Sequence, residues 1–298
     1  MLASRLSTWY VRIAEITIAE CDAIVQDHLY IFQITDALNG KTGAGTSASR
    51  LGSPDLALIT LPEMHANASM IASLDPSVPL IADADTGFGG PLSVARTVTA
   101  YINSNIAALH LEDQAISKRC GHLSNKELVS LDDFLVRIRA AVMARQQSGR
   151  DIVLIARTDA LQSLGFDEAV RRLKAAVEAG ADVAFLEGVM TRDQGRQVCA
   201  ALAPTPCLIN IVPGGVSPII SATEAQDLGY RIMIWPILSL TEVFNSTRRA
   251  MKTLKETGYV APAEDGSGGI RDIFGVCGLT ECAEFDKKAG GSAYGKGV

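Results

Sequence analysis

Short, continuously apolar runs recur along the chain, at intervals that leave room for a helix between them. Because these runs are apolar throughout rather than at alternate positions, each is typical of a strand buried on both faces of a sheet. The runs are Pro79–Asp83, Ala108–Glu112, Ile152–Arg157, Val183–Glu187, Cys207–Val212 and Ile232–Trp235. Leu131–Arg145 and Phe166–Ala179 have the spacing of amphipathic helices, and Gly180 follows the second as a C-cap would. Strands that alternate with helices predict a parallel α/β sheet.

Polar side chains gather where the predicted strands end, and this favours a barrel over a doubly wound open sheet. These residues are Asp83, Asp85, Glu112, Asp113, Arg157, Asp159, Glu187 and Asn210. In a (β/α)8 barrel the carboxyl ends of the strands form the face that carries the active site. A face of the sheet with a purely structural role would not need charged and amide groups at successive strand ends. We therefore predict a (β/α)8 TIM-type barrel.

The N-terminal part matches this pattern less well, because a barrel needs eight strands and the runs above supply only six. Thr42–Gly45 is a candidate end for another strand, but Leu29–Gly40 is a poor lead-in and residues 1–30 look helical at best. We predict an atypical N-terminal segment at 1–40, in which the first strand and helix are altered or incomplete. A barrel catalytic domain at 41–258 and a C-terminal helix with a Gly-rich tail at 259–298 follow.

The composition excludes several classes of protein. Of the 298 residues, 48% are hydrophobic and 20% are charged, and the net charge is −6, so the chain can bury a large core but lacks the basic stripe of a nucleic-acid-binding protein. No run approaches the roughly 18 apolar residues of a membrane span. The six cysteines form no CxxC pair and no secretory signal peptide precedes them. We expect reduced thiols and a cytoplasmic location.

Three carboxylates suggest a metal site. Asp83 and Asp85 end one predicted strand and Glu112 ends the next. Carboxylates that meet at adjacent strand ends repel one another unless a cation or protons intervene. Mg²⁺, which binds few protein ligands and retains several waters, suits such a site. The alternative is that these residues only form helix caps and turns.

The segment Lys118-Arg119-Cys120-Gly121-His122 lies in the longest interval between predicted strands, and hence in an extended loop. Neighbouring cations favour the thiolate form of a cysteine. We therefore predict that Cys120 has a lowered pKa and acts as a proton donor or nucleophile. The alternative is an inert cysteine, which is the expectation for the other five.

Two further features point to an anionic substrate. Arg157 ends a predicted strand, where its guanidinium would either clamp a carboxylate or pair with the acidic residues nearby. The turn at Gly43–Gly45 would either donate backbone N–H groups to an anion or serve only as a turn. His65 and His110 have no partner pattern, so both are interpreted as structural.

These segments, in this order, resemble the isocitrate lyase/phosphoenolpyruvate mutase superfamily over residues 41 to 298. The matching segments are Thr42–Gly45, Leu51–Asp55, Asp83–Gly89, Leu111–Gln114, Lys118–His122, Ile155–Ala160, Leu186–Gly188 and Asn210 with Ser217-Pro218. The Lys118–His122 loop is specific to the lyase side of the superfamily. The resemblance implies barrels that exchange their last helix between subunits and assemble as dimers of dimers.

The resemblance also implies a role for each matching residue. Asp83 would bind Mg²⁺ or Mn²⁺ directly, and Asp55, Asp85 and Glu112 would hold its water ligands. Cys120, on a loop that closes over the site, would protonate the leaving carbanion. The implied catalytic residues are Cys120, Arg157, Glu187 and His122. The implied substrate-binding residues are Thr42, Gly43, Ala44, Asp55, Lys118, Arg119, Gly121, Asn210 and Ser217.

The substrate implied by the resemblance is a small oxo- or hydroxy-dicarboxylate. Serine at position 217 resembles the hydrolase branch of the superfamily, which cleaves the hydrate of oxaloacetate to oxalate and acetate. The alternative is a lyase acting on 2-methylisocitrate or 2,3-dimethylmalate. Residues 33–41 lack the strand pattern usual in the family, so an inactive or binding-only relative is a second alternative. No nucleic-acid or membrane partner is expected.

Overall fold

The computed structural model describes residues 30–32, 42–263 and 266–294. Its strands are β1 (Tyr30–Phe32), β2 (Ile81–Asp83), β3 (Ala108–Glu112), β4 (Val153–Thr158), β5 (Val183–Leu186), β6 (Cys207–Asn210) and β7 (Ile232–Ile234). They form one seven-stranded sheet in the order β1-β7-β6-β5-β4-β3-β2, and every neighbouring pair is parallel. This sequential parallel order, with β1 beside β7, is that of a (β/α)8 TIM-type barrel, as predicted.

The six predicted strands are confirmed, with ends that differ by no more than two residues. The strand β1 was missed: its three residues pair with Ile232–Ile234 of β7, whereas the sequence indicated helix at best up to residue 30. The expected strand end at Thr42–Gly45 is wrong in its described part, because Gly43–Thr46 forms a helical turn. Its expected lead-in at residues 33–41 lies outside the described residues, as do residues 1–29.

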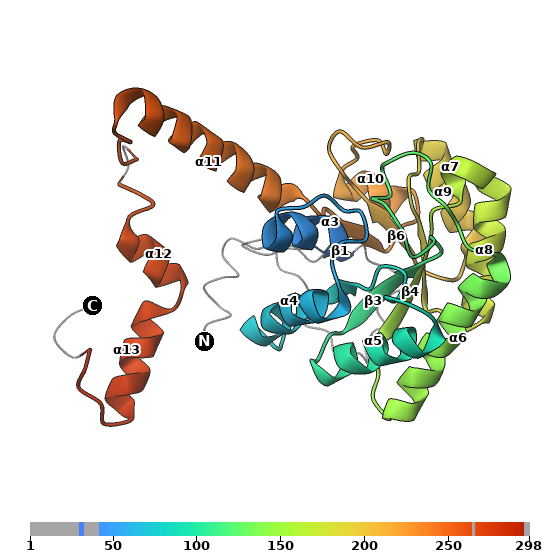
Figure 1. Cartoon of the computed structure of the whole chain (residues 1–298), viewed down its shortest axis with the longest axis horizontal. Coiled ribbons are helices and arrows are strands. Elements are labelled where there is room, and N and C mark those ends of the chain that lie inside the picture. Colours follow the sequence, from blue (N-terminus) through green and yellow to red (C-terminus); the bar gives the residue numbers. More distant parts are fainter. Residues whose placement is uncertain (1–29, 33–41, 264–265, 295–298) are drawn as a thin grey trace. The chain divides into compact units, whose positions relative to one another are not determined.

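Helices alternate with the strands, and α4, α5 and α6 lie outside the sheet in Figure 1. The helices are α3 (Gly43–Thr46), η1 (Ser47–Leu51), α4 (Leu61–Leu74), α5 (Pro91–Asn103), α6 (Leu131–Ser148), α7 (Leu161–Leu164), α8 (Phe166–Glu178), α9 (Arg192–Leu202), α10 (Ala222–Asp227), α11 (Leu238–Thr257), α12 (Ile270–Val276) and α13 (Leu279–Lys288). Local signals set their ends: Ser130 caps α6 by accepting from the Asp133 N–H at 3.1 Å. Gly149, at φ 64°, ends the same helix.

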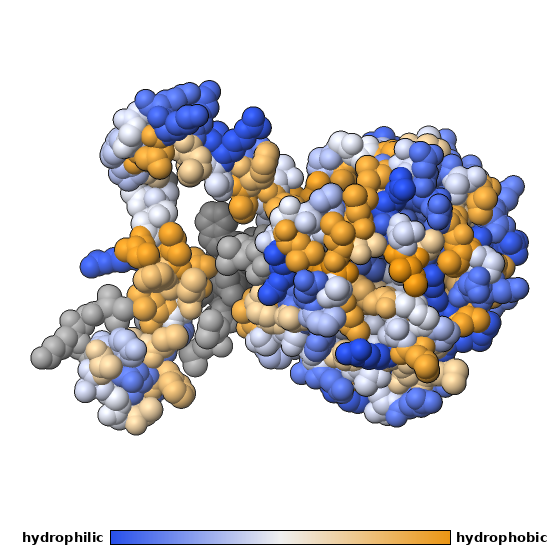
Figure 2. Space-filling view, in the orientation of Figure 1, coloured by the Kyte–Doolittle hydropathy of each residue, from blue (hydrophilic) through white to orange (hydrophobic). Residues whose placement is uncertain are grey.

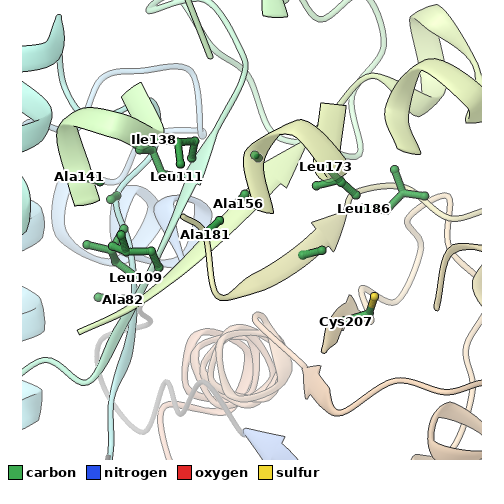
Figure 3. Close-up of a cluster of buried hydrophobic side chains, with 14 of the residues drawn as sticks. Ala82, Leu109, Leu111, Ile138, Ala141, Ala156, Leu173, Ala181, Leu186 and Cys207 are labelled. Carbon is green, nitrogen blue, oxygen red and sulfur yellow. The ribbon is translucent and has the colours of Figure 1, made fainter. Parts of the chain in front are cut away.

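Buried apolar side chains form two clusters, one on each side of the sheet. The larger lies between strands and helices and includes Leu109 and Leu111 of β3 against Ile138 of α6, as Figure 3 shows. The smaller fills the barrel interior with Ile81, Ala108, Ile155, Val183, Phe185, Leu208 and Ile234. Because successive side chains point to opposite faces of a strand, one apolar run supplies both clusters.

The chain divides into two compact units, one that extends through Glu242 and contains the sheet, and one that begins at Val243. The second unit contains most of α11, with α12 and α13, where the sequence indicated a single short helix after residue 258. Figure 2 shows apolar surface on this unit, to which Ile270, Phe274 and Phe285 contribute with exposed fractions of 61%, 47% and 75%. Among the described helices, none is both long enough and apolar enough to cross a membrane.

Candidate active site

A layer of buried polar side chains lies at the carboxyl ends of the strands, next to the apolar barrel interior. On β3, Ala108 belongs to the inner cluster, and His110 and Glu112 follow on the same face. On β4, Arg157 follows Ile155 in the same way and lies in register with Glu112. The alternation of side chains therefore directs the predicted site residues into the mouth of the barrel.

Asp83, the last residue of β2, is held by backbone groups. Its Oδ2 accepts a hydrogen bond from the Gly43 N–H at 2.6 Å, and its Oδ1 accepts one from the Asp85 N–H at 2.8 Å. The buried Tyr101 hydroxyl donates to the Asp83 carbonyl oxygen at 2.6 Å. A Cβ on Gly43 would lie 2.8 Å from Asp85 Oδ1 and 3.1 Å from Asp83 Oδ2, so a side chain here would displace these carboxylates.

Lys118 links the Cys120 loop to two carboxylates. Its Nζ lies 2.6 Å from Asp55 Oδ1 and 2.6 Å from Asp85 Oδ1, and all three side chains are buried. Burial raises the pKa of Asp85 to about 6, although Lys118 acts against this rise. A cavity of about 340 Å³ borders Asp85 and Lys118 and extends to Phe88 and Arg96.

Arg157 is surrounded by carboxylates. Its Nε and Nη2 donate to the two oxygens of Asp159 at 3.0 and 3.1 Å. Its Nε also lies 3.3 Å from Glu112 Oε2, and its Nη2 lies 3.3 Å from Glu187 Oε2. The guanidinium lies over the Phe185 ring, 5.2 Å from its centroid. The structure thus shows the pairing with acidic side chains that was one of the two interpretations, and carboxylate binding by Arg157 stays a prediction.

Glu187, His122 and Asn210 form a second polar group beside Arg157. Asn210 Nδ2 donates to Glu187 Oε2 at 3.1 Å, and His122 Nε2 lies 3.6 Å from Glu187 Oε1. Burial lowers the pKa of His122, so the ring is neutral. Its Nδ1 accepts from the Val216 N–H at 3.2 Å, and its Nε2 lies 3.4 Å from Asn210 Nδ2 on the side of Glu187.

Residues 113–130, between β3 and α6, form the extended loop that the sequence predicted. Its two ends pair through an antiparallel bridge between Gln114 and Leu128, and the Ala115 N–H donates to the Glu127 carbonyl at 2.8 Å. The Gln114 side chain binds both backbone groups of Arg119, at 2.9 and 3.1 Å. These bonds fix the base of the loop that carries Cys120.

The predicted lowering of the Cys120 pKa is wrong. Burial raises the pKa of the thiol, although the His122 backbone N–H acts against this rise. The cations that flank Cys120 in the sequence turn elsewhere, because Lys118 is held by carboxylates and Arg119 donates to the Ser124 carbonyl at 3.3 Å. A neutral thiol suits a proton donor rather than a thiolate nucleophile.

The carboxylates suit a hard divalent cation. Glu112 Oε1 is buried and has no hydrogen-bond partner among the described residues. Burial raises the pKa of Glu112 well above its ordinary value, and it also raises the pKa of Asp83, so a nearby cation would favour both anions. No three Asp, Glu, His or Cys side chains within the described ranges converge as a complete ligand set. Mg²⁺ usually binds few carboxylates directly and keeps several water ligands.

The chain is similar to known proteins both in sequence and in structure. Residues 32–255 match the family model of phosphoenolpyruvate phosphomutase. The chain belongs to the PEP mutase/isocitrate lyase superfamily. It is 42% identical to 2,3-dimethylmalate lyase from Eubacterium barkeri over 245 residues, which cover 82% of this chain and 83% of the lyase.

Solved structures of the superfamily resemble this chain throughout the barrel. A 2,3-dimethylmalate lyase structure has a TM-score of 0.86 and 46% identity, and the match covers 92% of this chain and 94% of that one. Oxaloacetate acetylhydrolase with the inhibitor 3,3-difluorooxalacetate has a TM-score of 0.81 and 52% identity, covering 85% and 86%. Phosphonopyruvate hydrolase with oxalate and Mg²⁺ has a TM-score of 0.71 and 27% identity, covering 83% and 85%.

Thr42, Ala44 and Ser217 are the predicted substrate-binding residues not yet described. Thr42 is buried, and its Oγ1 caps α3 by accepting from the Gly45 N–H at 2.7 Å. Ser217 is buried in the turn after β6, and Ala44 is half-buried on α3. His110, which the sequence left as structural, has its Nδ1 3.4 Å from Asp83 Oδ1 and so contacts a candidate metal ligand.

The sequence analysis assigned no role to three buried residues that hold Arg157 and its neighbours in place. Asp113 accepts hydrogen bonds from Thr158 Oγ1 at 2.5 Å, from the Asp159 N–H at 2.9 Å and from Arg172 Nη1 at 3.0 Å. The position of Asp113 and Asp159 at strand ends was a signal for both. Lys126 is also buried here, and nothing in its sequence context distinguishes it from a surface lysine.

Proposed function

We propose that this chain is a Mg²⁺-dependent enzyme that cleaves a carbon–carbon bond, with oxaloacetate hydrolysis to oxalate and acetate as its reaction. Its relatives include lyases and a hydrolase of this kind, and the oxaloacetate acetylhydrolase structure shares 52% identity with it. The observation that carries the proposal is the buried group of carboxylates, lysine and arginine at the barrel mouth, which suits a small dianionic substrate.

The proposed reaction consumes oxaloacetate and one water molecule and forms oxalate and acetate. Oxaloacetate takes up water at its ketone to form a hydrate, and one hydroxyl of the hydrate loses its proton. The C2–C3 bond then breaks, which leaves hydrogen oxalate and places the electron pair on C3. Hydrogen oxalate releases its remaining hydroxyl proton to solvent to give oxalate. A proton added to C3 completes acetate. The barrier lies in the enolate-like charge that develops during the cleavage, so an enzyme must stabilise this charge and supply the proton.

The carboxylates at the ends of β2 and β3 are the groups that would hold the metal. Asp83 would bind Mg²⁺ directly, and Asp55, Asp85 and Glu112 would bind its water ligands. The bound ion would supply positive charge for the substrate oxygens. Arg157 would orient a carboxylate, and its own position is fixed by Asp159. The N–H groups at the start of α3 lie on the Asp83 side of this site.

Cys120 would donate the proton to C3. Its raised pKa keeps the thiol protonated at neutral pH, which a general acid requires. Gly121, the next residue, packs against Arg157 and Glu187 so closely that a Cβ there would lie 2.6 Å from Glu187 Cγ. The loop therefore brings Cys120 to the same site as the arginine.

Ser217 supports the hydrolase over the lyase. It is buried in the turn that also carries Val216, whose N–H binds His122. A serine hydroxyl can bond the additional hydroxyl of a hydrate without the methyl group of threonine. The lyase alternative is favoured by the 2,3-dimethylmalate lyase relative and by the TM-score of 0.86 to its structure.

A substitution at Ser217 tests the choice between the two reactions. We expect Ser217→Thr to lower kcat/KM for oxalate release by roughly tenfold or more, because the added methyl group would displace the hydrate. Release of a 2-oxo acid from 2,3-dimethylmalate or 2-methylisocitrate is measured in parallel. Unchanged oxalate release would refute the serine argument, and 2-oxo acid release by the wild type without oxalate would establish the lyase alternative.

We also propose that the chain is a cytoplasmic homo-oligomer, a dimer of dimers. The apolar side chains exposed on α12 and α13, which include Ile273 and Phe274, support a contact with a second copy. Light scattering after gel filtration measures the mass directly. A monomer would refute this proposal.

A further inference from the structure

Lys126 is a buried lysine inside the loop that carries Cys120. Its side chain is 2% exposed, and its Nζ lies 3.2 Å from Asp159 Oδ1, whose side chain is fully buried. The same Nζ donates a hydrogen bond to the carbonyl oxygen of Gly121, five residues earlier in the loop. A lysine is seldom buried unless a specific partner compensates for its desolvation, and here there are two.

Both partners of Lys126 lead to the candidate active site. Asp159 holds the Arg157 guanidinium through two hydrogen bonds. Burial raises the pKa of Asp159, but Arg157 and Lys126 together hold that pKa below its ordinary value, so the carboxylate stays ionised. Gly121 directly follows Cys120, and its backbone packs against Arg157. One ammonium group thus joins the loop that carries Cys120 to Asp159, the residue after β4.

Other contacts of the loop lie on both sides of Cys120, but none of them joins the loop to Asp159. Gln114 binds the backbone at Arg119, and Lys118 binds Asp55 and Asp85, so both act before Cys120 in the chain. At Cys120 itself the backbone N–H donates to the Asp55 carbonyl at 3.1 Å, and after it the His122 ring accepts from the Val216 N–H and lies 3.6 Å from Glu187 Oε1. Lys126 supplies the charged contact on this second side, and it does so through the carbonyl next to the thiol.

We propose that Lys126 is a positioning residue that locks the Cys120 loop over the site, by joining the Gly121 carbonyl to Asp159. The inference rests on the proposed function only where Cys120 is taken as the proton donor. When the lock is intact, the thiol is held beside Arg157 and Glu187. Without it, the loop opens about its paired base at Ala115 and Glu127, and Cys120 leaves the site.

The test is the rate at which iodoacetamide alkylates each cysteine in the ligand-free full-length protein, resolved by peptide mass spectrometry. We expect Lys126→Met to raise the rate at Cys120 by about tenfold, because loop opening exposes the thiol and restores its ordinary acidity. The rates at Cys199 and Cys207, which are buried in the core, should not change. The matched control is Glu127→Gln, which removes one charge from the exposed neighbouring side chain and should leave all rates unchanged.

Several results would overturn the proposal. A parallel rise at Cys199 and Cys207 would mean that Lys126 only stabilises the fold. Lys126→Arg keeps a cation on Asp159 and therefore the fold, while its wider planar head displaces Gly121. If Lys126→Met or Lys126→Arg folds and its Cys120 is alkylated at the wild-type rate, the lock is refuted. Kinetics separate this proposal from the function: a lock predicts a fall in kcat with KM little changed, whereas absence of oxalate release by the wild type refutes the function alone.

Discussion

Replacement of Asp113 by asparagine should destabilise the barrel strongly although Asp113 is not assigned to the chemistry. Its side chain is fully buried and forms an ion pair with Arg172 at 3.0 Å, where Arg172 is 6% exposed. It also accepts hydrogen bonds from Thr158 and from the Asp159 N–H. An amide in its place keeps one acceptor oxygen but turns an N–H₂ group toward Arg172 or Thr158.

The expected loss follows from the burial of this pair. Removal of one partner from a buried ion pair costs about 3–5 kcal/mol, because the other charge remains uncompensated. Burial raises the pKa of Asp113 although Arg172 acts against this rise, and Arg172 keeps a second carboxylate, Glu168 Oε1 at 3.0 Å. Both facts reduce the loss, so we expect a value at the lower end, about 3 kcal/mol. Urea unfolding followed by circular dichroism measures this difference in the free energy of unfolding.

A matched control distinguishes this effect from a general loss of charge. Asp193 forms an ion pair with Arg196 at 3.4 Å, but the two side chains are 83% and 60% exposed. Asp193→Asn should therefore leave the unfolding midpoint almost unchanged. If Asp113→Asn destabilises no more than this control, the assignment of Asp113 as a buried structural anchor is refuted.

Three further predictions concern the chemistry. Cys120→Ala should lower kcat by about 10²–10⁴-fold with little change in KM, as expected for loss of a general acid, and an unaltered kcat would exclude Cys120 as the donor. Burial raises the Cys120 pKa, and the form that donates a proton is the protonated thiol. We therefore expect kcat to stay constant through neutral pH and to fall only above the ordinary pKa of a thiol. A fall that begins below pH of about 7 would contradict this. Glu112→Gln should weaken Mg²⁺ binding by about 10–100-fold in a calorimetric titration while circular dichroism stays unchanged, and equal affinity would remove Glu112 from the metal site.

The sequence predicted the fold to the extent that the fold depends on local periodicity. The predicted run Val183–Glu187 matches β5 (Val183–Leu186) to within one residue, because a strand buried on both faces leaves a continuous apolar signal. The strand β1 is only three residues long and is defined by its pairing with β7, a contact between opposite ends of the chain. Such a contact leaves no local pattern in the sequence, and this is why Tyr30–Phe32 was missed.

The sequence pattern predicted where several polar residues lie relative to the barrel, but not their electrostatics. Side-chain alternation placed Asp83, Glu112 and Arg157 on one face of the barrel. The direction of the Cys120 pKa shift was predicted wrongly, because neighbours in sequence are not neighbours in space. Lys118 turns to Asp85, and burial then dominates at the thiol. Lys126 gave no signal at all, since its importance depends on Asp159, which is brought to it only by the fold.

Oxalate release from oxaloacetate, measured with Mg²⁺ and again with a chelator, tests the central claim most directly. We expect the protein to release oxalate and acetate in equal amounts with Mg²⁺. A chelator should abolish both products, and restoring Mg²⁺ should recover them. A cooperatively folded protein that releases no oxalate would contradict the hydrolase proposal and favour a lyase for a branched 2-hydroxy acid. A protein that releases no product from any of these acids would favour the inactive, binding-only alternative.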